Sequence, residues 1–142
     1  MGLIEQIKRH EDAKHIPGAD FRPFKDTTGH LTIGWGRNLD TVGISEHIAE
    51  MLLAEDIARA QANLLATYPM FVALDEVRLG VLVELTFNLG IGGLKGFKQL
   101  LNAVRAGDFK LAAIHLLDSL YAKQVKSRAV ELAKELQSGQ WA

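Results

Sequence analysis

The most restrictive feature of the sequence is one short segment in which apolar residues alternate with polar ones or glycine. The alternation runs from residue 30 to residue 35, with Leu31, Ile33 and Trp35 as its apolar members. The pair Thr28-Gly29 before it is typical of a turn, and a period of two after a turn predicts a β-hairpin. Apolar spacing elsewhere is helical. The sequence therefore predicts an α+β fold, mostly α-helical, with one small antiparallel β-hairpin subdomain.

The amino-terminal end shows helical spacing. Leu3, Ile4 and Ile7 recur at the interval of a helix face, and Glu11 continues the same stripe. This pattern predicts a short helix that ends near Glu11. The segment 16–23, which holds two prolines and a glycine, then forces loop geometry.

Helical spacing returns from Ser45 onward. Ser45 is a good N-cap for a helix that reaches about Thr67, and Asp75 is one for an apolar helix over 77–89. Gly90 would close this second helix, and a glycine-rich loop would follow. Shorter helices are predicted over residues 97–106, 109–117 and 127–137.

These elements predict one domain with two unequal lobes. Residues 12–44 would form the small β-containing lobe, and residues 45–142 together with the amino-terminal helix would form the helical lobe. A cleft between the two lobes is the expected place for a ligand.

Composition narrows the class of protein. The 142 residues carry 16 basic and 17 acidic side chains, so the basic excess of a dedicated nucleic-acid binder is missing. The chain has no cysteine, which excludes disulfides and thiolate metal sites. We see no signal-peptide pattern and no apolar run of membrane-spanning length. We expect a monomer made in the cytoplasm, without stable membrane association.

Three residues could carry glycoside hydrolysis, which uses two carboxyl groups in different environments. Glu11, on the apolar stripe and near the negative end of a helix dipole, would be partly desolvated and would favour its protonated form. Asp26 and Thr32 flank the predicted turn and could together hold a water molecule. Each has a simpler explanation, because Glu11 could be a solvated helix-end residue and Asp and Thr are common turn formers.

We expect no metal and no cofactor. His10 and His15 are five residues apart, whereas the two histidines of a zinc-binding helix are four apart. The other three histidines show no spacing typical of metal ligands.

The run FKDTTGHLTIGWGRNL, preceded by a Glu on the first helix, resembles the phage lysozyme family. The similarity continues through VGIS, TFNLGIGGLKGF and KSRAVELAKELQSGQW, in the same order along the chain. This resemblance implies a lysozyme-like α+β fold. It also implies a muramidase that cleaves peptidoglycan between N-acetylmuramic acid and N-acetylglucosamine, with inversion and without a cofactor.

The resemblance also assigns roles to residues. Glu11 would protonate the leaving glycosidic oxygen. Asp26, in the run DTTG, matches the catalytic Asp, and Thr32 matches the Thr that helps this Asp hold the attacking water.

Three later residues match supporting positions of the family. Arg128 corresponds to an Arg that pairs with the catalytic Glu, and Phe87 and Asn88 correspond to residues that line the sugar cleft. Plain packing or surface charge would also explain these three residues.

The sequence departs from the family in several places. Fourteen residues separate Glu11 from Asp26, whereas the family has about eight, and the family spacing alone would select Asp20. We prefer Asp26 because DTTG and TIG follow it. Glu84 stands where relatives commonly have Asn, Tyr121 stands where Trp is common, and nothing in the sequence explains Glu84.

Two other functions remain open at this stage. A lytic transglycosylase would use one carboxylic acid and release an anhydro-sugar. A non-catalytic wall-binding or phage structural domain would keep the fold with an altered cleft. As an endolysin, the protein would accumulate in the host cytoplasm and reach the cell wall after release by a holin, as the family does.

Overall fold

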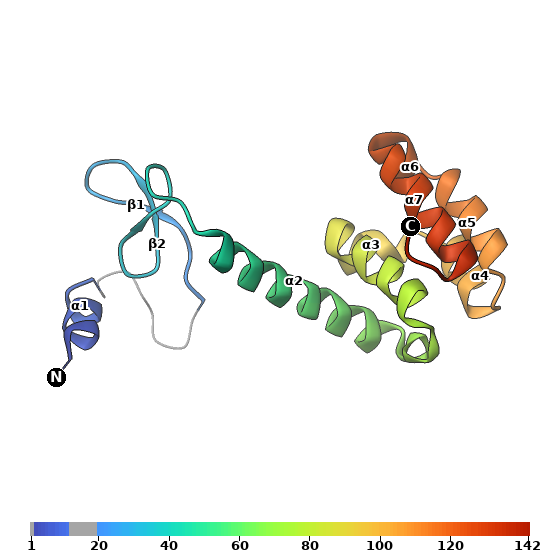
Figure 1. Cartoon of the computed structure of the whole chain (residues 1–142), viewed down its shortest axis with the longest axis horizontal. Helices are drawn as coiled ribbons and strands as arrows, with labels where there is room; N and C mark the ends of the chain where they lie inside the picture. The colour runs from blue at the N-terminus through green and yellow to red at the C-terminus, as the bar shows by residue number, and fades with distance from the viewer. Residues whose placement is uncertain (1, 12–19) are drawn as a thin grey trace. The chain divides into compact units, whose positions relative to one another are not determined.

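The structure, a computed structural model, describes residues 2–11 and 20–142 (Figure 1). His15, Pro17 and Gly18, which entered the predictions above, lie outside the described residues. The chain forms two compact units, Met1–Met51 and Leu52–Ala142, and each is described by itself. The predicted lobe boundaries, the grouping of the first helix with the helical lobe and the cleft between lobes stay predictions.

The first unit contains a short helix and a three-stranded antiparallel sheet with strand order β1-β2-β3. Its elements are α1 (Leu3–Glu11), β1 (Phe24–Lys25), β2 (Leu31–Ile33) and β3 (Arg37–Asn38). Thr32 in the central strand pairs with Phe24 on one side and with Asn38 on the other. The predicted hairpin is confirmed and gains a third strand. Trp35, the last apolar residue of the alternation, lies in the β2–β3 turn, after the end of β2.

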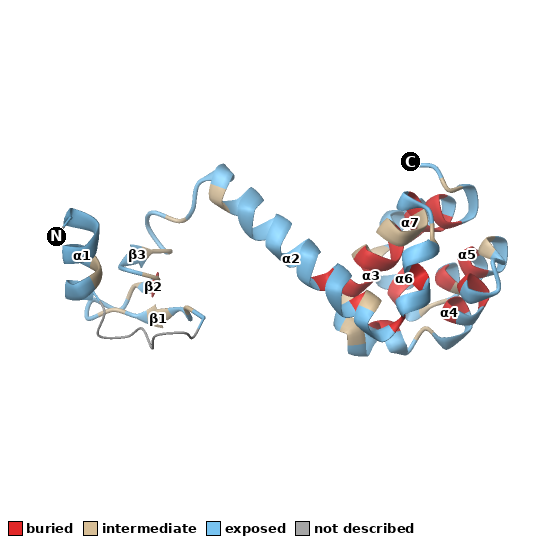
Figure 2. Ribbon diagram, turned by 90° about the horizontal axis from the view of Figure 1, so that it is seen from below, coloured by how far each residue is buried: buried red, intermediate tan, exposed pale blue. Residues whose placement is uncertain are grey.

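Helix α1 has no buried residue. Leu3 is 70% exposed, Ile4 is 65% exposed, and Glu11 is exposed as well (Figure 2). The predicted partial desolvation of Glu11 is therefore wrong for this structure. The apolar stripe identified a helix face, but periodicity alone does not say whether a core covers that face.

The second unit is helical. Its elements are α2 (Glu46–Thr67), which begins in the first unit, the 3-10 helix η2 (Pro69–Ala73), α3 (Glu76–Lys95), α4 (Lys98–Arg105), α5 (Phe109–Leu117), α6 (Leu120–Val125) and α7 (Ser127–Ser138). The predicted helices match α2, α4, α5 and α7 to within one residue at each end. The sequence analysis missed η2 and α6, which are too short to show a repeating apolar face.

Helix α3 begins and breaks at predicted residues but ends later than expected. The Asp75 carboxylate accepts a hydrogen bond from the Arg78 amide at 3.0 Å, which confirms the N-cap. Gly90 leaves helical geometry with φ 69° and ψ 166°. The residues after it resume the helix as far as Lys95, so the predicted glycine-rich loop was wrong. Leu94 is fully buried, and its packing outweighs the low helix propensity of the glycines.

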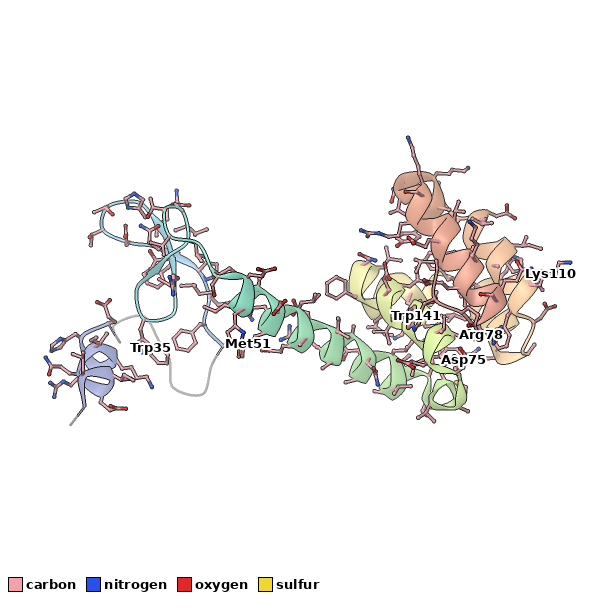
Figure 3. All side chains as sticks on the ribbon, viewed as in Figure 1. Trp35, Met51, Asp75, Arg78, Lys110 and Trp141 are labelled. Carbon is pink, nitrogen blue, oxygen red and sulfur yellow. The ribbon has the colours of Figure 1, made fainter. Side chains whose placement is uncertain are left out.

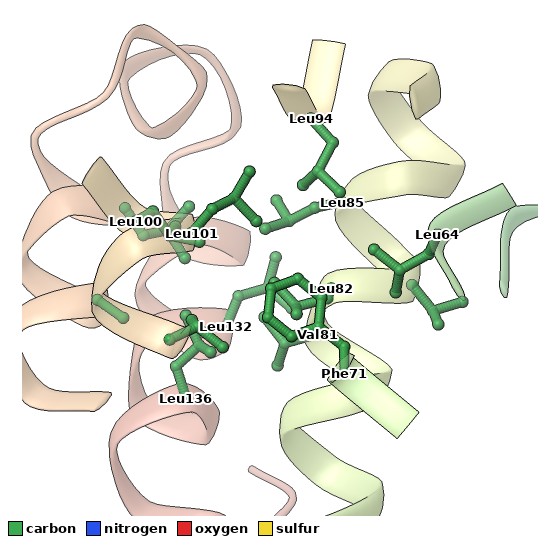
Figure 4. Packing of buried hydrophobic residues seen from close by; sticks show 14 of the residues in the cluster. Leu64, Phe71, Val81, Leu82, Leu85, Leu94, Leu100, Leu101, Leu132 and Leu136 are labelled. Atoms are coloured by element: carbon green, nitrogen blue, oxygen red, sulfur yellow. The ribbon is translucent and has the colours of Figure 1, made fainter. Parts of the chain in front are cut away.

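The hydrophobic core lies in the second unit. Val81, Leu82 and Leu85 of α3 are fully buried in it (Figure 4). The side chains packed around them come from every other helix of this unit and include Leu64, Phe71, Leu100, Leu116, Leu132 and Leu136. Among the described residues, a single helix, α3, has the length and the apolar composition that would allow it to span a membrane. Its central place in the core accounts for that composition.

One arginine joins the start of α3 to the end of α7. Arg78 donates through Nε to the Leu136 carbonyl at 2.7 Å and through Nη2 to the Gln137 carbonyl at 2.9 Å. Its third partner is Asp75, at 3.0 Å from Nη1 (Figure 3). The guanidinium also lies 3.8 Å from the centre of the Phe109 ring, a cation–π contact. Arg78 therefore satisfies carbonyls at the end of α7 that have no partner within that helix.

We expect Arg78→Ala to lower the free energy of unfolding by about 2–4 kcal/mol, because hydrogen bonds from a charged group contribute about 1.5–3 kcal/mol each. Urea denaturation followed by circular dichroism measures the change. The matched control is Arg59→Ala, since among the described residues exposed Arg59 pairs only with Glu55 and Asp56 on its own helix. Its effect should stay within about 0.5 kcal/mol. Equal losses in the two variants would contradict a joining role for Arg78.

Candidate active site

Asp26 stands at the first residue after β1, where the chain turns toward β2. Its amide donates to the His30 carbonyl at 2.9 Å, and its carbonyl accepts from the Gly29 amide at 3.0 Å. These two bonds close the turn over residues 26–30. The position of the Asp26 side chain is thus fixed by the backbone of the hairpin.

The two oxygens of the Asp26 carboxylate have different surroundings. Oδ1 accepts three hydrogen bonds, from the Thr28 amide at 2.9 Å, the Thr28 hydroxyl at 2.7 Å and the His30 amide at 2.9 Å. Every hydrogen bond that the described residues donate to this carboxylate ends on Oδ1. Oδ2 is the oxygen that remains for a water molecule.

The same bonds control the charge of Asp26. The Thr28 hydroxyl, followed by the His30 amide, holds the pKa of the carboxyl below its ordinary value of 3.8. Asp26 is therefore ionised throughout the neutral range. An ionised, half-buried carboxylate with one oxygen to spare can orient a water and accept its proton.

Thr32 lies at the centre of β2 and is 4% exposed. Its hydroxyl donates to the His30 carbonyl at 3.1 Å. His30 therefore connects the two residues, since its amide holds Asp26 and its carbonyl accepts from Thr32. The sequence analysis missed this role of His30, although an Asp followed by Thr two residues later is a known turn pattern.

Glu11, the last residue of α1, lies beside the turn that follows β2. A Cβ atom built on Gly36 would be 3.3 Å from Glu11 Oε2, so the carboxylate rests against the glycine backbone. The first unit thus places all three predicted catalytic residues around β2. Asp26 precedes this strand, Thr32 is within it, and Glu11 contacts the turn after it.

Asp20, the residue that the family spacing alone would select, has different surroundings. It is exposed, and its Oδ2 lies 3.8 Å from Arg22 Nη2. The choice between Asp26 and Asp20 stays a prediction. In the part of the chain that the structure describes, no group of three or more acidic, His or Cys side chains is placed to hold a metal ion.

The second unit brings the three predicted supporting residues together. Phe87, Asn88 and Arg128 line a pocket of about 660 Å³. The wall is mostly apolar, and its other members are Leu53, Ile57, Gln61, Glu76, Leu79, Gly80, Val83, Glu84 and Trp141. Such a pocket, mostly apolar with a few polar groups, is typical of a ligand site.

A polar chain along this pocket explains Glu84. Arg128 Nη1 donates to the Asn88 amide oxygen at 3.2 Å, and Arg128 Nε lies 3.9 Å from Glu84 Oε1. Asn88 Nδ2 in turn donates to the Tyr121 hydroxyl at 3.4 Å. Glu84 is thus an ion-pair partner of Arg128. The expected pairing of Arg128 with Glu11 stays a prediction.

The family model described as phage lysozyme matches residues 14–134. The chain belongs to the phage lysozyme family. The matched range includes every predicted site residue except Glu11, which lies before residue 14, where the match begins.

A curated relative extends the similarity over nearly the whole chain. It is the pre-baseplate central spike protein Gp5 of Enterobacteria phage T4, which is 25% identical over 167 aligned positions. These cover 98% of the chain described here and 28% of the spike protein. The chain thus spans about a quarter of the length of this relative. Membership of the phage lysozyme family supports a function in the lysis of peptidoglycan.

Replacing Thr28 by Val should raise the pKa of Asp26 toward 3.8, because the variant loses the hydroxyl donor and keeps the amide donor. An NMR titration of the Asp26 side-chain carboxyl carbon measures this shift. Thr27→Val is the matched control, since Thr27 is in the same turn and is not a partner of Asp26.

The sign of the pH dependence follows from linkage. Because folding lowers the pKa of Asp26, its contribution to stability is present above pH 3.8 and is lost as the pH falls through the folded value. In Thr28→Val this loss should occur at higher pH than in the wild type. The same pKa in both proteins would show that the hydroxyl does not control the ionisation.

Proposed function

We propose that the protein hydrolyses the β-1,4 bond between N-acetylmuramic acid and N-acetylglucosamine in peptidoglycan, with inversion at the anomeric carbon. The observation that carries this proposal is the Asp26 carboxylate, which is ionised and keeps Oδ2 available for water. Family membership and the position of Glu11 in the same unit support it.

The proposed reaction consumes one water molecule. Glu11 donates its proton to the glycosidic oxygen, and the bond between this oxygen and the anomeric carbon breaks. The water oxygen bonds to the anomeric carbon from the opposite face, and Asp26 Oδ2 accepts the proton that the water loses. Proton exchange with solvent then restores the protonated Glu11 and the ionised Asp26.

Thr32 has a supporting role in this mechanism. Its hydroxyl hydrogen is directed to the His30 carbonyl, so the hydroxyl oxygen keeps lone pairs for a water molecule. A water held between Asp26 and Thr32 would be fixed in direction before the substrate arrives. Positioning of this kind is a large part of the rate enhancement in enzymes.

The pocket of the second unit, taken by itself, is a proposed binding site for sugar or peptide groups of peptidoglycan. Phe87 offers an exposed aromatic face that suits the apolar face of a sugar ring. Asn88 and Arg128 offer hydrogen-bond donors for acetamido or carboxylate groups of the glycan and its peptide. We further propose that the protein is made in the host cytoplasm and acts on the cell wall, and that it is a monomer.

Glu11→Gln should abolish the clearing of outer-membrane-permeabilised Gram-negative cells, because an amide is not acidic enough to transfer a proton to the leaving oxygen. Turbidity measures lysis, and circular dichroism and urea denaturation check that the variant folds like the wild type. Exposed Glu5→Gln, on the same helix, is the matched control and should keep full activity. Full residual activity in Glu11→Gln would overturn the assignment.

The products of the wild-type reaction identify its class. Hydrolysis with inversion gives a reducing end of inverted anomeric configuration, visible by NMR immediately after cleavage. A lytic transglycosylase would give an anhydro-sugar lighter by the mass of one water. Release of that product would refute the hydrolytic mechanism even if Glu11 proved essential.

Asp26→Asn and Asp20→Asn together test the second carboxylate. We expect activity to fall at least about a hundredfold in Asp26→Asn, because positioned acid–base groups contribute about 10²–10⁴-fold. Asp20→Asn, which loses a contact with exposed Arg22, should keep activity within about twofold. Loss of activity in Asp20→Asn alone would show that Asp20, and not Asp26, is the second catalytic carboxylate.

A second candidate function rests on the similarity to the spike protein. The chain could serve as one domain of a larger phage particle protein and bind the cell wall without cutting it. Sedimentation with purified peptidoglycan, followed by an assay for new reducing ends, separates the two functions. Binding without new reducing ends would favour this second candidate.

A further inference from the structure

The β2–β3 turn, residues Gly34, Trp35 and Gly36, contacts α1 at two points. At the first, Lys8 Nζ lies 4.7 Å from the centre of the Trp35 ring, a cation–π contact. The ring is itself packed edge-on against Phe21, at 4.6 Å between ring centres. Trp35 is thus held between the helix and the chain that leads into the sheet.

The second contact is between Gly36 and Glu11. A Cβ on Gly36 would be 3.3 Å from Glu11 Oε2, 3.5 Å from Cδ and 3.9 Å from Oε1. The whole carboxyl group therefore faces the side of Gly36 on which another residue would carry its side chain. The 3.3 Å approach is tighter than ordinary van der Waals contact, so a methyl group at this place would displace the carboxylate by a few tenths of an ångström.

We propose that this turn is the positioning element for Glu11. Trp35 holds the last turns of α1 through Lys8, and Gly36 leaves the space in which the carboxylate lies. Both residues would act through Glu11 and not on the substrate, so both are positioning residues. The consequence for activity rests on the proposed function, whereas the consequence for the carboxylate position does not.

The turn supplies its own control. Gly34 and Gly36 both have positive φ, 63° and 87°, so alanine is strained at either position. A Cβ on Gly34, however, meets nothing within 4 Å, whereas one on Gly36 meets Glu11. Gly36→Ala and Gly34→Ala should therefore both strain the backbone, and only Gly36→Ala should also displace the Glu11 carboxylate.

The first measurement is the ¹³C NMR resonance of the Glu11 side-chain carboxyl in labelled protein, assigned through Glu11→Gln. We expect Gly36→Ala to shift this resonance and Gly34→Ala to leave it in place. The second measurement is the initial rate on solubilised peptidoglycan at several concentrations. In Gly36→Ala we expect kcat to fall on the order of tenfold, with KM within about twofold, because small misplacement of a reacting group affects the chemical step. Gly34→Ala should keep both constants close to the wild-type values.

A second pair of variants tests the Trp35 contact without strain at a glycine, and it keeps the proposal testable if Gly36→Ala does not fold. Lys8→Met removes the cation over Trp35, whereas Arg9→Met removes the next charge along the same helix. We expect the Glu11 resonance to move in Lys8→Met and to stay in Arg9→Met.

An unchanged Glu11 resonance in both Gly36→Ala and Lys8→Met would overturn the proposal. Equal losses of kcat in the two glycine variants would overturn it too, because backbone strain alone would then explain them. A further outcome is a wild-type protein that has no activity while the variants still show the expected resonance shifts. That result would refute the proposed function and leave the positioning role intact.

Discussion

The small sheet depends on polar side chains that close its turns, because its strands are too short to be held by a core. The central strand β2 has three residues, and Thr32 is the one among them that is fully buried. The Asp26 carboxylate holds the turn before β2. After β3, the Asn38 side chain accepts from the amides of Asp40 and Thr41, and the Asp40 carboxylate accepts from the Leu31 amide at 2.7 Å. These bonds fix the ends of the strands, and with them Asp26, which follows β1, and Thr32, at the centre of β2.

The second unit is stabilised in a different way. Its helices share one apolar core around α3, and the polar contacts at its surface join helix ends. The candidate supporting residues Phe87 and Asn88 are exposed residues of α3, whereas Val81, Leu82 and Leu85 of the same helix are buried in the core. The core thus fixes the helix that carries these two residues, and substitutions at such exposed positions can change what the pocket binds at little cost to stability.

Where the sequence predicted the fold well, a local signal was sufficient. Ser45 and Asp75 each accept a hydrogen bond at the start of the helix predicted after them. The segment with a period of two contains β2, the central strand of the sheet. Where it failed, long-range packing decided the outcome. Residues 91–95 are helical because Leu94 is buried in the core, and α6 is a single short helix held by the burial of Tyr121.

The candidate site was partly predictable for the same reason. Residue types and the local motifs DTTG and TIG selected Asp26 and Thr32, and the resemblance to the family added Glu11 on the first helix. Contacts between segments distant in sequence were not predictable, and the partnership of Glu84 with Arg128 and the approach of Glu11 to Gly36 are of this kind. A single sequence contains no direct record of such pairs.

Asp26 shows how one side chain can serve both the fold and the chemistry. The bonds that Oδ1 accepts close the turn, and the same bonds keep the carboxyl ionised. Oδ2 is left for water by that geometry, so the turn itself prepares the group for its proposed role. A replacement that kept the turn would need an acceptor at Oδ1, and one that kept the chemistry would need the negative charge as well. Asn meets the first condition and fails the second, so the proposed chemistry, more than the folding of the turn, would require an acid at this position.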